Sequence, residues 1–128
     1  MAGMNHRVES EFVHFVAESL QPLGPVIAKR MFGGHGLFLH DAMFALIVWD
    51  TLYFKVDQVN RPQYDALGLA PFSYVGQKGN SATMNYCEAP PDALDAPDTL
   101  CRWAKEAYAA ALRAQPRHDH RTQNKRLG

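Results

Sequence analysis

The sequence has 128 residues, which is the length of one ordinary domain and too short for two. Hydrophobic residues make up 47% of the chain and charged residues 20%, and this balance excludes wholesale disorder. Basic and acidic residues number 13 each, which excludes nucleic-acid binding that relies on the net charge of the whole chain.

The charges are nevertheless distributed unevenly. Residues 115–128 contain four basic residues and one acidic residue, whereas the first 114 residues contain nine basic and twelve acidic residues. The last segment also has almost no apolar side chain to bury. We therefore expect a folded domain over residues 1–114 and a basic, disordered tail over residues 115–128.

The sequence contains no segment suited to a membrane. Its longest apolar run, Met43–Trp49, is far too short to cross a bilayer, and residues 1–7 are polar. We expect a cytoplasmic protein that makes no membrane contact. In that compartment Cys87 and Cys101 are expected to be free thiols.

A helix is predicted over residues 8–23, where apolar residues recur at steps of three and four. Glu9 and Glu11 fall in its expected first turn, and Pro22 and Gly24 are expected to end it.

Three consecutive antiparallel strands are predicted next, at residues 26–39, 43–49 and 52–56. The first of them is interrupted by Gly33–Gly36. Short turns are expected after residue 39, at His40-Asp41-Ala42, and at Asp50-Thr51.

A short helix is predicted over residues 57–67, capped by Asp57 or Asn60. Asn60 is favoured because proline is tolerated only in the first turn of a helix, and Pro62 follows Asn60 closely. Gly68 is placed to end this helix in a left-handed conformation.

The second half of the chain continues with strands at 72–75 and 83–87 and a long helix that begins at an Asp95 cap and ends near Ala114. The resulting order is α-β-β-β-α-β-β-α. This order indicates an α+β fold of two layers, with an antiparallel sheet of about five strands and helices packed on it.

No motif indicates catalysis, a cofactor or a metal. A phosphate-binding loop needs a helix after its glycines, but a β-prone run follows Gly33–Gly36, so a sheet bulge or a tight turn is favoured there. The six histidines lack the spacing that brings three or four zinc ligands together. We expect no cofactor, no metal and no enzymatic activity.

Two further residues have open interpretations. Trp49 precedes a predicted turn, where it either anchors a partner or, as we favour, packs over the edge of the sheet. Lys55 alternates with Phe54 and Val56, so the pattern alone indicates a lysine that faces solvent.

Three strings together carry a family resemblance: Lys29–Phe38 (KRMFGGHGLF), Met43–Ile47 (MFALI) and Leu52–Asp57 (LYFKVD). They resemble the N-terminal domain of the TfoX/Sxy family of bacterial competence regulators. The resemblance spans about residues 8–114 and identifies the chain as a stand-alone form of that domain, ending in a basic tail.

The resemblance implies an α+β sandwich in the bacterial cytoplasm. It also implies a role in regulating competence genes together with a transcription factor, and full-length members carry a second, helical C-terminal domain. The family supplies no catalytic residues. The positions that match its signature are Arg30, Phe32, Gly33, Gly34, Gly36 and Lys55.

Three functional hypotheses follow. The leading one is a non-enzymatic regulator that contacts another protein, such as a transcription regulator, through a sheet edge or through the Gly33–Gly36 loop with Arg30. The second is weak DNA binding by the tail, whose four basic residues give a salt slope of at most about −3.6. The third is a small-molecule binder with a pocket near His35, Arg30 or Lys55. Monomer and homodimer both remain open.

Overall fold

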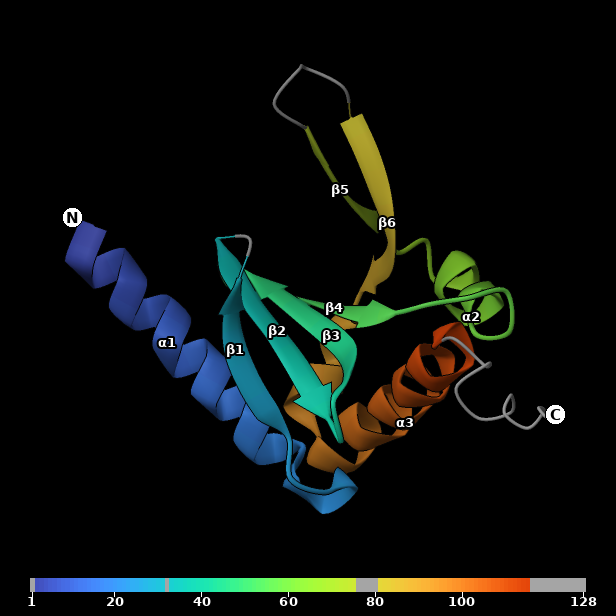
Figure 1. Ribbon diagram of the computed structural model, residues 1–128, viewed down its shortest axis with the longest axis horizontal. Helices are drawn as coiled ribbons and strands as arrows, with labels where there is room; N and C mark the ends of the chain where they lie inside the picture. Colours follow the sequence, from blue (N-terminus) through green and yellow to red (C-terminus); the bar gives the residue numbers. More distant parts are fainter. Residues whose placement is uncertain (1, 32, 76–80, 116–128) are drawn as a thin grey trace, which may run out of the picture.

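The computed structural model describes residues 2–31, 33–75 and 81–115. Its centre is one antiparallel sheet of six strands in the order β1-β2-β3-β4-β6-β5, as Figure 1 shows. The strands are β1 (Ile27–Met31), β2 (Gly34–Leu39), β3 (Ala42–Val48), β4 (Thr51–Lys55), β5 (Pro71–Val75) and β6 (Ser81–Glu88). The helices are α1 (Ala2–Ser19), α2 (Arg61–Ala66) and α3 (Pro97–Ala114), with short 3-10 turns at Gln21–Leu23 and Pro91–Asp95.

The predicted α+β class is confirmed, and the sheet has six strands where about five were expected. The stretch 26–39 forms two strands, because the chain reverses where one interrupted strand was predicted. Met31 pairs with Gly34 across this reversal, and Gly33 between them has φ 75°, a left-handed conformation that glycine adopts without strain. The Gly33–Gly36 segment thus supplies the tight turn and the beginning of β2.

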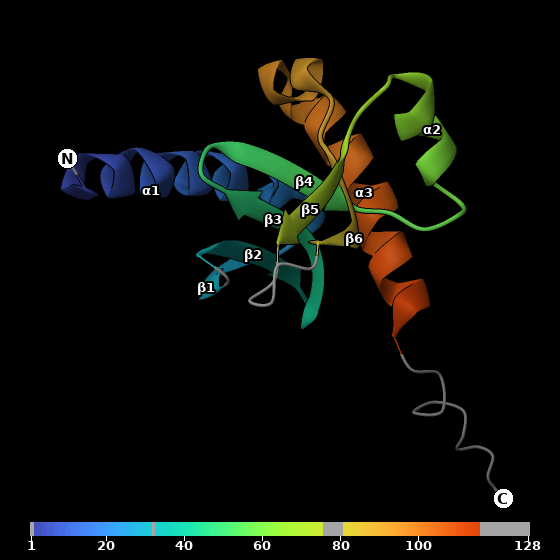
Figure 2. The same ribbon diagram turned by 90° about the horizontal axis from the view of Figure 1, so that it is seen from above.

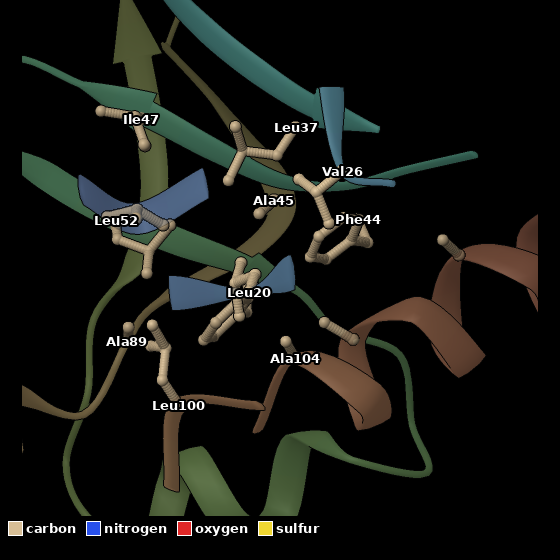
Figure 3. Packing of buried hydrophobic residues seen from close by; sticks show 14 of the residues in the cluster. Leu20, Val26, Leu37, Phe44, Ala45, Ile47, Leu52, Ala89, Leu100 and Ala104 are labelled. Atoms are coloured by element: carbon tan, nitrogen blue, oxygen red, sulfur yellow. The ribbon is translucent and has the colours of Figure 1, made fainter. Parts of the chain in front are cut away.

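The hydrophobic core lies between the sheet and the two long helices. Side chains of α1, β2, β3, β4 and α3 form one buried cluster. Figure 3 shows Leu20, Phe44 and Leu100 within it. Ala104 and Ala107 of α3 are fully buried, and their small side chains allow the helix backbone to lie close to β3 and β4. The apolar stripe predicted for the last helix is therefore confirmed as its buried side.

The β5–β6 hairpin extends beyond the rest of the sheet. Strand β4 pairs with β6 only at Tyr86–Glu88, so the preceding part of β6 continues past the end of β4 (Figure 1). Figure 2 shows this hairpin from above. The ring of Tyr53 packs edge-on against Phe72 at 4.9 Å between centroids and ties the base of the hairpin to β4. The turn expected between these two strands falls at residues 76–80, outside the described residues.

Two hairpin turns join the central strands. His40 and Asp41 have φ values of 49° and 70°, which identify a type I′ turn at the predicted place. The next turn was predicted one residue too late: Val48 pairs with Thr51, so the turn consists of Trp49 and Asp50. An Asp-Thr pair looks more turn-like than a Trp-Asp pair, but the alternation of β3 and β4 sets the register.

The helix boundaries partly follow the predictions. The first helix begins at Ala2 rather than at residue 8, so Glu9 and Glu11 lie inside it and not in its first turn. It ends at Ser19, and the chain continues as a 3-10 turn that contains Pro22. The last helix has Ala96 at its N-cap, because Asp95 is taken up by the preceding 3-10 turn.

The short helix α2 is shorter than predicted, with Asn60 at its N-cap position. Its end is the glycine stop that the sequence predicts. Gly68 has φ 68°, its N–H donates to the carbonyl of Asp65, and the N–H of Leu69 donates to the carbonyl of Tyr64. These two hydrogen bonds form a Schellman motif, which satisfies the last carbonyls of the helix.

Candidate functional site

The structure separates the predicted signature residues into two groups. Arg30, Gly33 and Gly34 lie at the β1–β2 turn, whereas Lys55 lies at the far end of β4. Gly36 follows within β2, and Phe32 is outside the described residues. The signature positions therefore do not converge on one site.

Two of the signature glycines make room for their neighbours. A Cβ atom on Gly34 would collide with the backbone carbonyl of Ile47, so only glycine allows β2 to begin this close to β3. A Cβ on Gly36 would lie 2.7 Å from the sulfur of Met43 and 3.0 Å from that of Met31. Gly36 thus leaves space for the side chains that gather on the sheet surface away from the helices.

The β1–β2 and β3–β4 turns lie side by side at one end of the sheet. His35 pairs with Ile47, and the contact of Gly34 with Ile47 and Val48 brings the start of β2 against the end of β3. Arg30 is exposed on the edge strand β1, and Trp49 is 68% exposed at the neighbouring turn. We call Arg30, Gly33 and Trp49 the turn-end surface.

Trp49 does not pack over the sheet edge as the sequence favoured. Its φ of 59° lies in the left-handed region, which costs a bulky side chain of the order of 1 kcal/mol or more. The tight pairing of Val48 with Thr51 imposes this conformation. A large aromatic side chain is thereby held out from the turn, away from the core.

Lys55 belongs to a polar cleft of about 460 Å³ at the opposite end of β4. The residues that line it from the β4–α2 segment are Lys55, Val56, Asp57, Gln58 and Arg61, and Asn85 of β6 and Ala114 of α3 complete it. The ammonium group of Lys55 lies over the ring of Tyr86, 5.1 Å from its centroid. The sequence pattern indicated that Lys55 faces solvent, but in the structure it is half-buried and lines a cleft.

A buried asparagine fixes the backbone of this cleft. The side chain of Asn60 is fully buried, accepts a hydrogen bond of 2.8 Å from the N–H of Asp57, and donates one of 3.0 Å to the carbonyl of Lys55. Asn60 makes no side-chain cap bond to helix α2, although it occupies the N-cap position. Its amide is used to close the loop between β4 and α2.

The carboxylate of Asp57 is fully engaged at the rim of the cleft. Arg113 of α3 donates two hydrogen bonds to it, of 2.6 and 3.0 Å, and the N–H groups of Val59 and Asn60 donate to it as well. The hydrogen bonds from Arg113, and to a smaller extent those from the backbone, lower the pKa of Asp57 to about 2. The Asp57 carboxylate is therefore charged and already neutralised by a partner at neutral pH.

The thiols are poorly placed for nucleophilic chemistry. Burial raises the pKa of Cys87 and of Cys101, so both groups are protonated at neutral pH. Both cysteines are free, as predicted. Within residues 2–31, 33–75 and 81–115, no group of three or more histidine, cysteine or acidic side chains is arranged to hold a metal ion.

The sequence patterns did not predict most of the residues that line the cleft. Asp57 and Asn60 were considered only as helix caps, and neither Arg61 nor Asn85 carries a motif. The pairing of Asp57 with Arg113 joins residues 56 positions apart, which no local pattern could indicate. Lys55 was found only through the family resemblance.

None of the helices in the described part of the chain is both long enough and apolar enough to cross a membrane.

The comparisons with known proteins agree with the resemblance found in the sequence. A family model described as the TfoX N-terminal domain matches residues 18–111. A curated relative, the DNA transformation protein TfoX1 of Aliivibrio fischeri, is 37% identical over 83 residues. The match covers 65% of this chain but only 37% of that relative, so this chain corresponds to little more than a third of its length.

Proposed function

Because this chain belongs to the TfoX N-terminal domain family, we propose that it is a non-enzymatic regulatory domain that acts in competence-type regulation by contacting another protein. The name of the relative, a DNA transformation protein, supports the biological setting. The protonated thiols of Cys87 and Cys101 and the fully engaged Asp57 carboxylate support the absence of catalysis.

The turn-end surface is the observation that carries this proposal. Tryptophan and arginine are the residue types that contribute most to protein interfaces, and here Trp49 and Arg30 are exposed at the same end of the sheet. A monomeric domain gains nothing from holding a tryptophan in a left-handed turn with most of its surface in water. A partner protein that buries the indole ring of Trp49 would gain the favourable free energy of removing that ring from water.

The edge strand β1 adjoins this surface and is also open. Lys29 and Arg30 project from it, and its outer backbone groups are not paired within the sheet. These cations disfavour pairing between two copies of β1, because like charges would face each other. They favour a partner with acidic side chains, and we propose a transcription regulator in the cytoplasm as that partner.

Trp49→Gly separates partner contact from stability. Glycine accepts a φ of 59° without strain, so we expect this variant to fold at least as stably as the parent chain. When Trp49→Gly is introduced into the chromosome of the source cell, we expect the frequency of DNA transformation to fall to that of a strain in which the gene is deleted.

The matched control is Leu67→Ala. Leu67 is another large apolar side chain with 57% exposure, but it lies at the end of α2, at the other end of β4 from Trp49 (Figure 1). This control is expected to leave transformation unchanged. If deletion of the gene does not alter transformation or transcription of competence genes, the proposed function is wrong.

A further inference from the structure

We propose that the cleft between the β4–α2 segment, β6 and the end of α3 binds a small organic anion through Lys55 and Arg61. The ligand class is a metabolite that carries a phosphate or carboxylate group. This inference concerns a different end of the molecule from the turn-end surface, and it holds or fails independently of the proposed protein contact.

The size of the cleft suits such a ligand. Its volume of about 460 Å³ lies within the range of small-molecule sites, roughly 300–1,000 Å³. Five of its seven lining residues are polar or charged, and the lining comes from three separate parts of the chain, the β4–α2 segment, Asn85 and Ala114. A ligand placed there would contact all three parts at once.

Among the described side chains, the two cations of the cleft, Lys55 and Arg61, form no ion pair. Lys55 contacts the ring of Tyr86, and a guanidinium nitrogen of Arg61 lies 3.9 Å from the sulfur of Cys87. Neither cation has a carboxylate within 4 Å among the side chains that the structure describes. Burial raises the pKa of Tyr86 to about 12, so its phenol is neutral and supplies no negative charge.

The one acid among the described lining residues, Asp57, does not cancel these charges. Asp57 accepts hydrogen bonds from two guanidinium nitrogens of Arg113 and from two backbone N–H groups, so its charge is already balanced. The cleft therefore presents the surplus positive charge of Lys55 and Arg61. An arginine beside a lysine is a donor set well suited to anionic oxygens, because guanidinium can donate two parallel hydrogen bonds.

The backbone that carries these donors is also fixed before any ligand arrives. Asn60 fixes the carbonyl of Lys55 and the N–H of Asp57, and the Tyr86 ring supports the ammonium group of Lys55. Arg61 begins helix α2 directly after Asn60, and its N–H donates to the carbonyl of Asp57. Such preorganisation lowers the entropic cost of binding.

The test is a ¹H–¹⁵N NMR titration of the full chain at constant ionic strength. Inorganic phosphate and pyrophosphate form one arm, citrate forms the other, and chloride is the reference anion. We expect saturable shifts of the amide signals of Gln58, Arg61 and Asn85 with at least one anion at millimolar concentration. Saturation by the phosphates alone or by citrate alone identifies the group that the site prefers.

Lys55→Met and Arg61→Gln are each expected to weaken this binding about tenfold, the effect of losing one charged hydrogen bond. Lys29→Met is the matched control, because Lys29 also lies over an aromatic ring, 4.8 Å from the centroid of Phe38, but outside the cleft. The affinity of Lys29→Met for the anion is expected to stay within about twofold of that of the parent chain.

Three results would overturn the proposal. One is a linear shift with no saturation for every anion. Another is an equal loss of affinity in Lys29→Met, which would indicate general surface electrostatics. The third is unchanged affinity in both cleft variants, with spectra that show an intact fold.

Discussion

The carboxylate of Asp57 links the β4–α2 loop to the last turn of α3. It accepts two hydrogen bonds from Arg113 and two from the backbone, and its pKa falls from 3.8 to about 2. A carboxylate whose pKa is lower in the folded state stabilises the fold above its unfolded pKa. That contribution is lost as the pH falls from about 3.8 through about 2.

Replacing the arginine tests this link. In Arg113→Gln we expect the pKa of Asp57 to rise toward 3.8, while the backbone donors keep it somewhat below that value. The free energy of unfolding at neutral pH should fall by less than about 1 kcal/mol, because the ion pair is partly exposed and screened by solvent. Carboxyl ¹³C NMR titration gives the pKa of Asp57, and chemical denaturation gives the free energy of unfolding.

The control for this substitution is Arg102→Gln, which removes an exposed arginine elsewhere on α3. Its Asp57 carboxyl should titrate as in the parent chain. A pKa near 2 that persists in Arg113→Gln would show that the ion pair is not the main cause of the shift.

At the scale of elements, the sequence predicts most of the fold because local patterns agree with it. The apolar stripe of α3, the turn at His40-Asp41 and the glycine stop at Gly68 all appear where they were expected. Residue register across strands is a non-local property, so the turn at Trp49-Asp50 was misplaced by one residue.

The difference between local patterns and non-local contacts also explains why the sequence did not predict the sixth strand or the cleft. The glycines at 33–36 were correctly expected to form a turn or a bulge, but the alternation on either side does not say whether the chain reverses. The cleft depends on contacts between β4, β6 and α3, and a single sequence gives no information on those contacts. Lys55 could be singled out, but its neighbours could not.

The two glycines at the β1–β2 turn are expected to tolerate alanine differently. Gly33→Ala meets no atom within 4 Å and should cost about 1 kcal/mol of stability, because only its positive φ is strained. Gly34→Ala meets the backbone of Ile47 and should cost about 3 kcal/mol. Urea denaturation of both variants gives the comparison, and a cost for Gly33→Ala at or above that for Gly34→Ala would contradict this account.

At the scale of the whole molecule, the open sheet has one face covered by α1 and α3 and two different ends. The turn-end surface presents Trp49 and Arg30, and the opposite end presents the Lys55 cleft. The basic residues after residue 115 lie outside the described part of the chain, so their role as a tail stays a prediction. The division of the chain at residue 114 also stays a prediction.

A salt series tests whether the tail binds DNA. We expect any binding of labelled duplex DNA by the full chain to be weak, with a slope of the logarithm of affinity against the logarithm of salt no steeper than about −3.6. Changing Arg117, Arg121, Lys125 and Arg126 to glutamine should abolish this binding, as measured by fluorescence anisotropy. Sequence-specific binding that survives these changes would make direct DNA recognition the better explanation.

The central claim, that the turn-end surface contacts a partner protein, is tested most directly by quantitative affinity capture from the source cell. The parent chain, Trp49→Gly, Arg30→Glu and Leu67→Ala are compared at equal expression. The account predicts one partner recovered by the parent and by Leu67→Ala, and lost with both turn-end variants. Equal recovery by all four chains, or no specific partner with the parent, would contradict it.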